Sequence, residues 1–514
     1  MKYFLTLIQL WVGFLSICAS YPKANIWIIP SVESPQVYRN YAQTSKVHLE
    51  MARGEVEHIQ LVFPSKVNEE YRFTFDRYLK GIQISARELK KMNGYYDALV
   101  PFKNQLKRTD TLTAVWITVQ CPSRVPVGKY HQTIKIEGSK HFTIQLDYNV
   151  HHTTIPLKSS IPITVGVENR CMTECLNDKE ADKERQRWVD FVLSYRMTPV
   201  FGTQITPERW QYEHSFSPWA WNDKRSIRLL NDRRYSCYML PFFTLSENEL
   251  ASLLCNIQKK GKLKESLFYI WDEPAYMEDY EQIKRKVNII RKYASDARIL
   301  TTFFCGPRNG PRKGDLYAVF DYLKHHIHVA TISLAPCKGN EEEVQHIRYK
   351  VPEGIDWWSY VCWQPGGNEP NFLLQMKGIQ QRAIMWRTWK NGSQGFLYWN
   401  CNIYHKRNPF TYITDMPHGD GILIYPGDIL GCKGPIASAR LERWRDGAEE
   451  MELLRLVEKN YSKEKADTLL NIVYSSPLSF IEKAHNIPFF RKELLDQLDK
   501  TIPIDYKLRI TDFI

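Results

Sequence analysis

Two adjacent carboxyl groups follow an apolar segment near the middle of the chain. Residues 267–271 (LFYIW) lead directly into Asp272, Glu273 and Pro274. Two carboxyls side by side near a core are costly, because desolvation and mutual repulsion both oppose their joint ionisation. The arrangement suits chemistry in which one group is a protonated acid and its neighbour is an anion. Asp272 and Glu273 are therefore candidate catalytic residues, and the structural alternative is a polar junction that caps the next helix.

An acid pair beside aromatic residues best fits hydrolysis of a glycosidic bond. An ordinary retaining glycosidase holds two carboxyls about 5–5.5 Å apart on opposite sides of that bond, which neighbours in sequence cannot easily do. Neighbours can act from one side. Glu273 would protonate the leaving oxygen, while Asp272 holds the substrate's own 2-acetamido group as the nucleophile and steadies the charge on its nitrogen in an oxazolinium intermediate. We expect neither a metal ion nor a cofactor.

Aromatic and amide side chains gather in two later segments, where a sugar pocket would need them. Stacking of sugar faces on rings, with polar atoms fixing hydroxyls, would orient a hexosamine. Alternation along a strand also sends every second ring into the core, and Trp357, Trp386 and Trp389 are the weaker candidates. The predicted substrate-binding residues are Tyr360, Trp363, Trp358, Tyr398, Trp399 and Asn400.

The elements that carry these residues follow a repeated strand–helix rhythm after residue 162, which is typical of βα units. Eight parallel strands close a (β/α)8 barrel, whose active site lies at the C-terminal strand ends. Long connections after residues 202 and 399 favour a distorted, TIM-like barrel. Helices are expected at 179–193, 247–259, 277–293 and 372–389. The predicted strands are 163–167, 198–201, 237–243, 267–271, 299–304, 328–334, 356–361 and 395–399.

The chain before the barrel alternates apolar and polar residues in short segments separated by Gly, Pro and Asn, which predicts an antiparallel β-sandwich. Clear examples are residues 47–51, 59–63 and 115–119. The predicted fold class is thus multidomain β plus α/β. Its parts are a signal peptide (1–20), a β-sandwich domain (21–155), a catalytic (β/α)8 barrel (160–460) and a small helical C-terminal extension (461–514).

The first twenty residues predict a secreted or periplasmic protein. Lys2, an apolar run and the small pair Ala19-Ser20 are typical of a signal peptide cut after Ser20. A membrane anchor is the alternative, but the run is shorter than the roughly 20 residues that a span needs. Lipid attachment at Cys18 is a weaker alternative, because the large Ile17 precedes it. After removal of the peptide we expect no integral membrane span.

Composition excludes several classes of protein. With 43% hydrophobic and 25% charged residues in 514, the chain is neither disordered, collagen-like nor a coiled coil. The formal charge of +12 is dispersed, which argues against nucleic acid. The expected partner, a glycan or glycoconjugate, follows from the acid pair and the aromatic residues. The cysteines lie mostly in apolar segments at irregular spacing and predict buried thiols more than disulfides. Cys171 and Cys175 lack partners at metal-ligand spacing. No pattern points to an oligomeric state.

Five motifs in order resemble glycoside hydrolase family 123 and the wider group of secreted bacterial proteins that share its C-terminal domain. They are residues 52–62, 271–274, 395–400, 419–427 and 440–447. The resemblance implies an exo-acting, retaining β-N-acetylgalactosaminidase with Glu273 as general acid/base and Asp272 orienting the acetamido group. The last motif is interpreted as packing of the final barrel helix. Alternatives are hydrolysis of an N-acetylglucosamine or non-acetylated hexose glycoside, and a catalytically silent glycan-binding protein.

Overall fold

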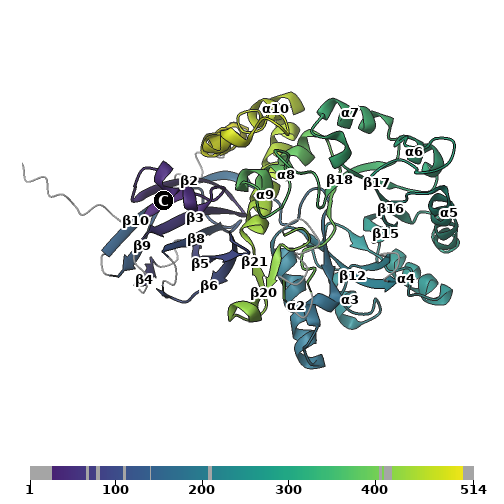
Figure 1. Cartoon of the computed structure of the whole chain (residues 1–514), viewed down its shortest axis with the longest axis horizontal. Coiled ribbons are helices and arrows are strands. Elements are labelled where there is room, and N and C mark those ends of the chain that lie inside the picture. Colours follow the sequence, from purple (N-terminus) through teal and green to yellow (C-terminus); the bar gives the residue numbers. More distant parts are fainter. Residues whose placement is uncertain are drawn as a thin grey trace, which may run out of the picture.

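The computed structural model describes residues 26–64, 69–76, 81–107, 111–138, 141–206, 211–404, 408–409 and 419–501. The expected signal peptide and Cys18 lie outside these ranges. Figure 1 shows a β-rich N-terminal part in purple beside a larger part of strands and helices, with α8 (Gly378–Lys390) and α9 (Ala439–Asn460) between them. None of the helices within the described ranges has the length and apolar character to cross a membrane.

The N-terminal part consists of two five-stranded sheets, β1-β3-β8-β5-β6 and β2-β10-β9-β4-β7, that enclose a shared apolar core. All neighbouring strands are antiparallel except β2 and β10, and this parallel pair departs from the predicted antiparallel sandwich. Gly54 (φ 87°) is the single residue between β2 and β3, which lie in different sheets, so β2 pairs not with β3 but with β10, a strand distant in sequence. The strands are β1 (Trp27–Pro30), β2 (Lys46–Arg53), β3 (Glu55–Pro64), β4 (Glu70–Phe75), β5 (Gln83–Met92), β6 (Tyr95–Pro101), β7 (Gln105–Lys107), β8 (Leu112–Cys121), β9 (Gly128–Glu137) and β10 (His141–Thr154).

The larger part is built on a nine-stranded sheet in the order β13-β12-β11-β19-β18-β17-β16-β15-β14. All its strands run parallel except β13, which is antiparallel to β12, and each parallel strand overlaps a predicted one. Within the described residues the ladder stays open between β14 and the β12–β13 edge, so the sheet is a nearly closed barrel. The strands are β11 (Ile163–Glu168), β12 (Thr198–Thr206), β13 (Gln211–Ser215), β14 (Tyr238–Met239), β15 (Ser266–Trp271), β16 (Arg298–Phe303), β17 (Val329–Ser333), β18 (Asp356–Val361) and β19 (Phe396–Tyr398).

Helices cover the outside of this sheet. α4 begins at Glu247 because Ser246 and Glu249 form a capping box. The predicted helix 372–389 begins later, at Gly378, because the buried Asn371 side chain donates to the carbonyl groups of Cys362 and Pro365 and holds a non-helical lead-in with a turn at residues 373–376. The remaining helices are α1 (Asn169–Thr173), α2 (Asp178–Ser194), α3 (Lys224–Leu229), α4 (Glu247–Lys259), α5 (Met277–Arg291), α6 (Ala318–Leu323) and α7 (Glu341–Lys350).

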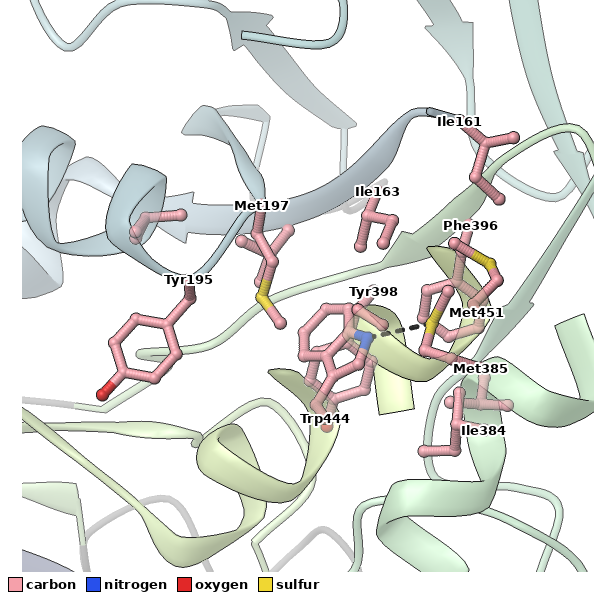
Figure 2. Close-up of a cluster of buried hydrophobic side chains, with 14 of the residues drawn as sticks. Ile161, Ile163, Tyr195, Met197, Ile384, Met385, Phe396, Tyr398, Trp444 and Met451 are labelled. Carbon is pink, nitrogen blue, oxygen red and sulfur yellow. Dashed lines mark hydrogen bonds between the residues drawn. The ribbon is translucent and has the colours of Figure 1, made fainter. Parts of the chain in front are cut away.

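α9 is buried along most of its length and packs against α8 and against β3 and β6 of the N-terminal part. Figure 2 shows its Trp444 at the centre of a cluster, with the indole N–H donating to the sulfur of Met385 at 3.2 Å. The rings of Phe396 and Tyr398 lie 5.7 and 6.0 Å from Trp444, centroid to centroid. The motif at 440–447 is thus in the interior, in agreement with its interpretation as helix packing.

The last helices of the described residues are α10 (Lys463–Leu470) and α11 (Ile487–Asp499), which pack on α9. Arg491 of α11 contacts Glu55 at 2.6 Å and Glu57 at 2.8 Å, both on β3, and lies 3.6 Å from Glu450 of α9. Within residues 461–501 the segment is therefore mainly helical, as predicted, but α11 belongs to the contact between the two parts and does not stand apart as an appendage. A short hairpin of β20 (Ile424–Pro426) and β21 (Pro435–Ala437) precedes α9.

Candidate active site

The acid pair lies where β15 ends. Asp272 and Glu273 are both exposed, and both border the same cavity. Glu273 has a left-handed backbone (φ 46°), which is uncommon for a residue with a side chain and concentrates at functional sites. Its N–H donates to Oγ1 of Thr302 on the neighbouring β16, at 3.0 Å. The turn therefore presents both carboxyls at the end of the strand without a helix cap between them and the cavity.

Asp272 is anchored through one oxygen. The hydroxyl groups of Tyr269 and Thr302 each donate to Oδ1 at 2.7 Å. Because both hydrogen bonds found among the described residues reach Oδ1, Oδ2 is available to accept a hydrogen bond from a bound molecule. Two hydroxyl donors suit a carboxylate that acts as an acceptor.

Glu273 is held differently. The hydroxyl of Tyr360, at the end of β18, donates a short hydrogen bond to its Oε1. Burial and the negative charge of Asp272 raise the pKa of Glu273 to about 7, while the Tyr360 hydrogen bond and the Arg308 charge act in the opposite direction. A carboxyl with this pKa carries its proton in a large fraction of molecules near neutral pH, as a general acid requires.

Three residues that sequence reasoning did not single out complete this arrangement. Tyr269 and Thr302 hold Asp272, and His214 of β13 stacks on Tyr269 with the ring centroids 4.3 Å apart. Burial lowers the pKa of His214 to about 4, so its imidazole is neutral. Polar residues inside otherwise apolar strands were the available signal for Tyr269 and Thr302. His214 gave none, because β13 is an antiparallel insertion outside the βα rhythm.

The cavity has a volume of about 830 Å³ and lies over the C-terminal strand ends. Trp399 and Asn400, just past β19, border it. The Trp399 indole N–H donates to Asp420 Oδ1 at 3.1 Å, and Asn400 Oδ1 accepts the backbone N–H of Asn402. Gly166 of β11 permits this approach, since a Cβ there would lie 1.8 Å from the Trp399 carbonyl oxygen. The loop after β19 is thus fixed tightly against the first barrel strand.

The other predicted sugar contacts have varied positions. Tyr360 touches Glu273, as described. Tyr398 borders the cavity, but its ring packs on Trp444 and its hydroxyl donates to Asp420. Trp358 is 1% exposed and packs in the inner core of the sheet. Trp363 is 45% exposed beyond β18 and is not among the residues that border the cavity.

The tryptophans ranked lower, Trp357, Trp386 and Trp389, are buried in the core. The geometry thus brings Tyr360 to Glu273 and places Trp399 and Asn400 on the same cavity as the acid pair, and it gives Trp358 and Tyr398 a packing role. Within the described ranges no cluster of three or more His, Cys, Asp or Glu side chains is placed to hold a metal ion.

Comparison with solved structures supports the fold. A family 123 glycoside hydrolase from Clostridium perfringens, studied for glycolipid glycan hydrolysis, aligns with a TM-score of 0.64 at 13% identity, over 95% of this chain and 100% of that one. At this identity the likeness concerns the fold. A GH2 β-galacturonidase from Eisenbergiella tayi aligns with a TM-score of only 0.34 at 9% identity, over 77% of this chain and 90% of that one, too low to support an argument.

Comparison of sequences gives the family. No curated protein matches the chain. The model of the glycoside hydrolase 123 catalytic domain matches residues 183–457, which include the acid pair, most of the residues that border the cavity and most of α9. More than half of the chain is covered by this match, and the five motifs resemble the same family. The chain therefore belongs to glycoside hydrolase family 123.

Proposed function

We propose that this glycoside hydrolase is an exo-acting enzyme that releases terminal β-linked N-acetylgalactosamine by a retaining, substrate-assisted mechanism. One observation carries the proposal: an Asp272 anchored through Oδ1 stands directly beside a Glu273 whose pKa is raised to about 7. Both carboxyls are on one strand end, so they serve one side of the bond, as substrate assistance requires and a two-sided carboxylate mechanism does not.

In the first step the acetamido carbonyl oxygen of the substrate attacks C1 and the C1–O bond to the leaving group breaks. Glu273 gives its proton to the departing oxygen, and Asp272 Oδ2 accepts the acetamido N–H, which stabilises the positive charge of the oxazolinium ring. In the second step Glu273, now ionised, takes a proton from water. The water oxygen bonds to C1, the ring opens, and the sugar leaves with its original configuration.

The surroundings support these roles. Tyr360 orients Glu273, and Tyr269 with Thr302 orients Asp272. Trp399 offers an indole whose direction is fixed by Asp420, a suitable surface for a sugar face. For this function the nearly closed sheet would act as a distorted (β/α)8 barrel over residues 160–460, and the protein would be exported by the signal peptide at 1–20.

Comparison of aryl β-glycosides of N-acetylgalactosamine, N-acetylglucosamine and galactose tests the proposal. We expect the N-acetylgalactosaminide to be hydrolysed fastest and the galactoside not measurably, because it has no acetamido nucleophile. If the N-acetylglucosaminide is cleaved fastest, the preferred sugar is N-acetylglucosamine. Efficient cleavage of the galactoside would exclude substrate assistance. Saturable binding without any product would identify a silent glycan-binding protein.

A thiazoline analogue of the cyclised intermediate tests the role of Asp272 separately. It should inhibit competitively, and Asp272→Asn should weaken that inhibition by about 10²-fold because a charged acceptor for the ring nitrogen is lost. Equal inhibition of both proteins would remove Asp272 from its proposed role, even if hydrolysis itself is observed.

A further inference from the structure

A further carboxyl group lies across the barrel mouth from the acid pair. Glu168 is the last residue of β11 and is buried. β11 and β15 are not neighbours: four strands separate them along the ladder on one side, and β12, β14 and the open gap of the sheet separate them on the other. The cavity reaches both strand ends, because Gly166 and Val167 of β11 border it together with Asp272 and Glu273. The proposed mechanism gives Glu168 no role, although it stands where the cavity meets β11.

The backbone of Glu168 is fixed by the side chain of Asn402, in the loop after β19. The N–H of Glu168 donates to Asn402 Oδ1 at 2.8 Å, and its carbonyl oxygen accepts from Asn402 Nδ2 at 3.2 Å. The N–H of Asn402 donates in turn to Oδ1 of Asn400, which borders the cavity. Within the described ranges Nδ2 of Asn400 has no hydrogen-bond partner. Glu168 and Asn400 therefore belong to one hydrogen-bonded assembly, in which Asn400 still has N–H groups to donate.

The side chain of Glu168 has one oxygen atom that the protein does not use. Oε1 accepts the N–H of Arg170 at 3.3 Å and so caps α1, whereas no hydrogen bond or ion pair to Oε2 occurs among the residues that the structure describes. Burial raises the pKa of Glu168 to about 7, while the N–H and the charge of Arg170 act in the opposite direction. A buried carboxyl with an unused oxygen is costly for the fold alone, and groups of this kind concentrate at functional sites.

Gly202 of β12 leaves the space between Glu168 and the cavity open. Gly202 borders the cavity, and so does Tyr212 of β13. A Cβ at position 202 would lie 3.9 Å from Glu168 Oε2 and 3.5 Å from the Tyr212 ring, which are ordinary contact distances. A methyl group would therefore fit there, and it would occupy the space between the unused oxygen and the ring. Because glycine supplies no such group, Oε2 is within reach of a molecule in the cavity.

We propose that Glu168 is a specificity-determining residue whose Oε2 accepts a hydrogen bond from the C4 hydroxyl of the terminal sugar, while Asn400 Nδ2 donates to the same edge of the ring. The inference rests on the proposed function. With C1 at Glu273 and the acetamido group at Asp272, the C4 corner of the pyranose ring points away from β15, toward β11 and β12. A hydroxyl that donates to a carboxylate forms a strong hydrogen bond, and a site built for that hydroxyl rejects a sugar that lacks it.

Removal of the hydroxyl from the substrate and of the charge from the enzyme tests this pairing. The substrates are the aryl β-glycosides of N-acetylgalactosamine and of its 4-deoxy analogue. We expect kcat/KM of the unaltered enzyme to be about 10²-fold higher for the first, which we call the hydroxyl preference. Glu168→Gln should lower kcat/KM for the N-acetylgalactosaminide about 10- to 30-fold but for the 4-deoxy glycoside by less than about threefold.

Two further variants separate recognition from folding. Gly202→Ala leaves the carboxyl in place, and its methyl group should lower the hydroxyl preference by restricting access to Oε2. Asp178→Asn removes the same charge from an exposed acid at the start of α2 and should change neither kcat/KM value.

Three outcomes would overturn the role of Glu168 while the proposed function stands. They are equal losses on both glycosides in Glu168→Gln, a hydroxyl preference that survives both Glu168→Gln and Gly202→Ala, and an unaltered enzyme that cleaves both glycosides equally well. If the unaltered enzyme hydrolyses neither glycoside, the proposed function fails together with this inference.

Discussion

Carboxyl groups cluster both at the end of β15 and on the buried face of α9. The two clusters differ in their exposure to solvent, in the charges of their neighbours and in the direction of their pKa shifts. Glu442 of α9 is fully buried and accepts hydrogen bonds or ion pairs from Tyr195 at 2.7 Å, Arg87 at 2.6 Å and Arg445. Although burial opposes ionisation, these partners and His58 hold the pKa of Glu442 well below its ordinary value. Glu273 has one hydroxyl donor, a neighbouring anion and a raised pKa.

The contrast shows how structural and chemical acids can be told apart in one molecule. A carboxyl surrounded by cations and closed to solvent contributes to the fold, because its charge is already matched. A carboxyl open to a cavity and short of matching charge retains a proton to transfer. The two sites can be altered separately, by substitutions at Glu273 or Tyr360 beside the cavity and at Glu442 in α9.

The largest effect is expected from Glu273→Gln. Loss of the general acid should lower kcat by about 10³- to 10⁴-fold, which corresponds to about 4–5.5 kcal/mol of barrier. Steady-state kinetics with an unactivated glycan substrate measures it, and Glu281→Gln, exposed on α5 and outside the cavity, is the matched control. Activity within tenfold of the unaltered enzyme would show that Glu273 is not the acid.

The same isosteric change in α9 should affect stability. Glu442→Gln leaves Arg87, Arg445 and His58 without their buried anion, and we expect a loss of about 3–5 kcal/mol in the free energy of unfolding. Urea titration at pH 7 measures it. Glu458→Gln, on the exposed end of the same helix, should change stability by less than about 0.5 kcal/mol. A negligible loss for Glu442→Gln would contradict the structural role given to this acid.

Above neutral pH, Glu273→Gln should increase the free energy of unfolding, whereas Glu442→Gln decreases it. The folded-state pKa of Glu273, about 7, lies above the ordinary 4.5, so the unaltered protein loses stability as pH rises through this interval. The variant should therefore be more stable at pH 8 by on the order of 1 kcal/mol, after allowance for solvent screening in the open cavity. The difference should vanish at pH 4. Melting temperatures across this range measure it, and a destabilised variant at pH 8 would refute the assigned pKa shift.

The smallest effect concerns Tyr360. Its hydrogen bond favours the ionised form of Glu273, so Tyr360→Phe should raise the pKa of that carboxyl and move the alkaline limb of the kcat/KM profile to higher pH. The alkaline limb of the unaltered enzyme should fall with an apparent pKa of about 7. An unchanged or acid-shifted limb would contradict the contact, whatever the change in maximal rate.

The course of the chain was largely predictable because hydrophobic periodicity is a local property. Each parallel barrel strand overlaps a predicted segment, and Asp272 and Glu273 were visible as polar residues directly after an apolar run. Thr302 and His214 were not assigned to the site, because their function depends on strand register and on the inserted strand β13. The direction of an aromatic ring is equally non-local, so Trp358 and Tyr398 could not be separated from Trp399 by sequence.

The link between α11 and β3 has a consequence for the order of events during biosynthesis. Arg491 neutralises Glu55 and Glu57, yet it is made more than four hundred residues after them. While the ribosome is still extending the chain, the first-made sheets contain two acids whose counter-ion does not yet exist. The N-terminal part therefore reaches its final electrostatic balance only when α11 emerges, so β3 and α11 mature together.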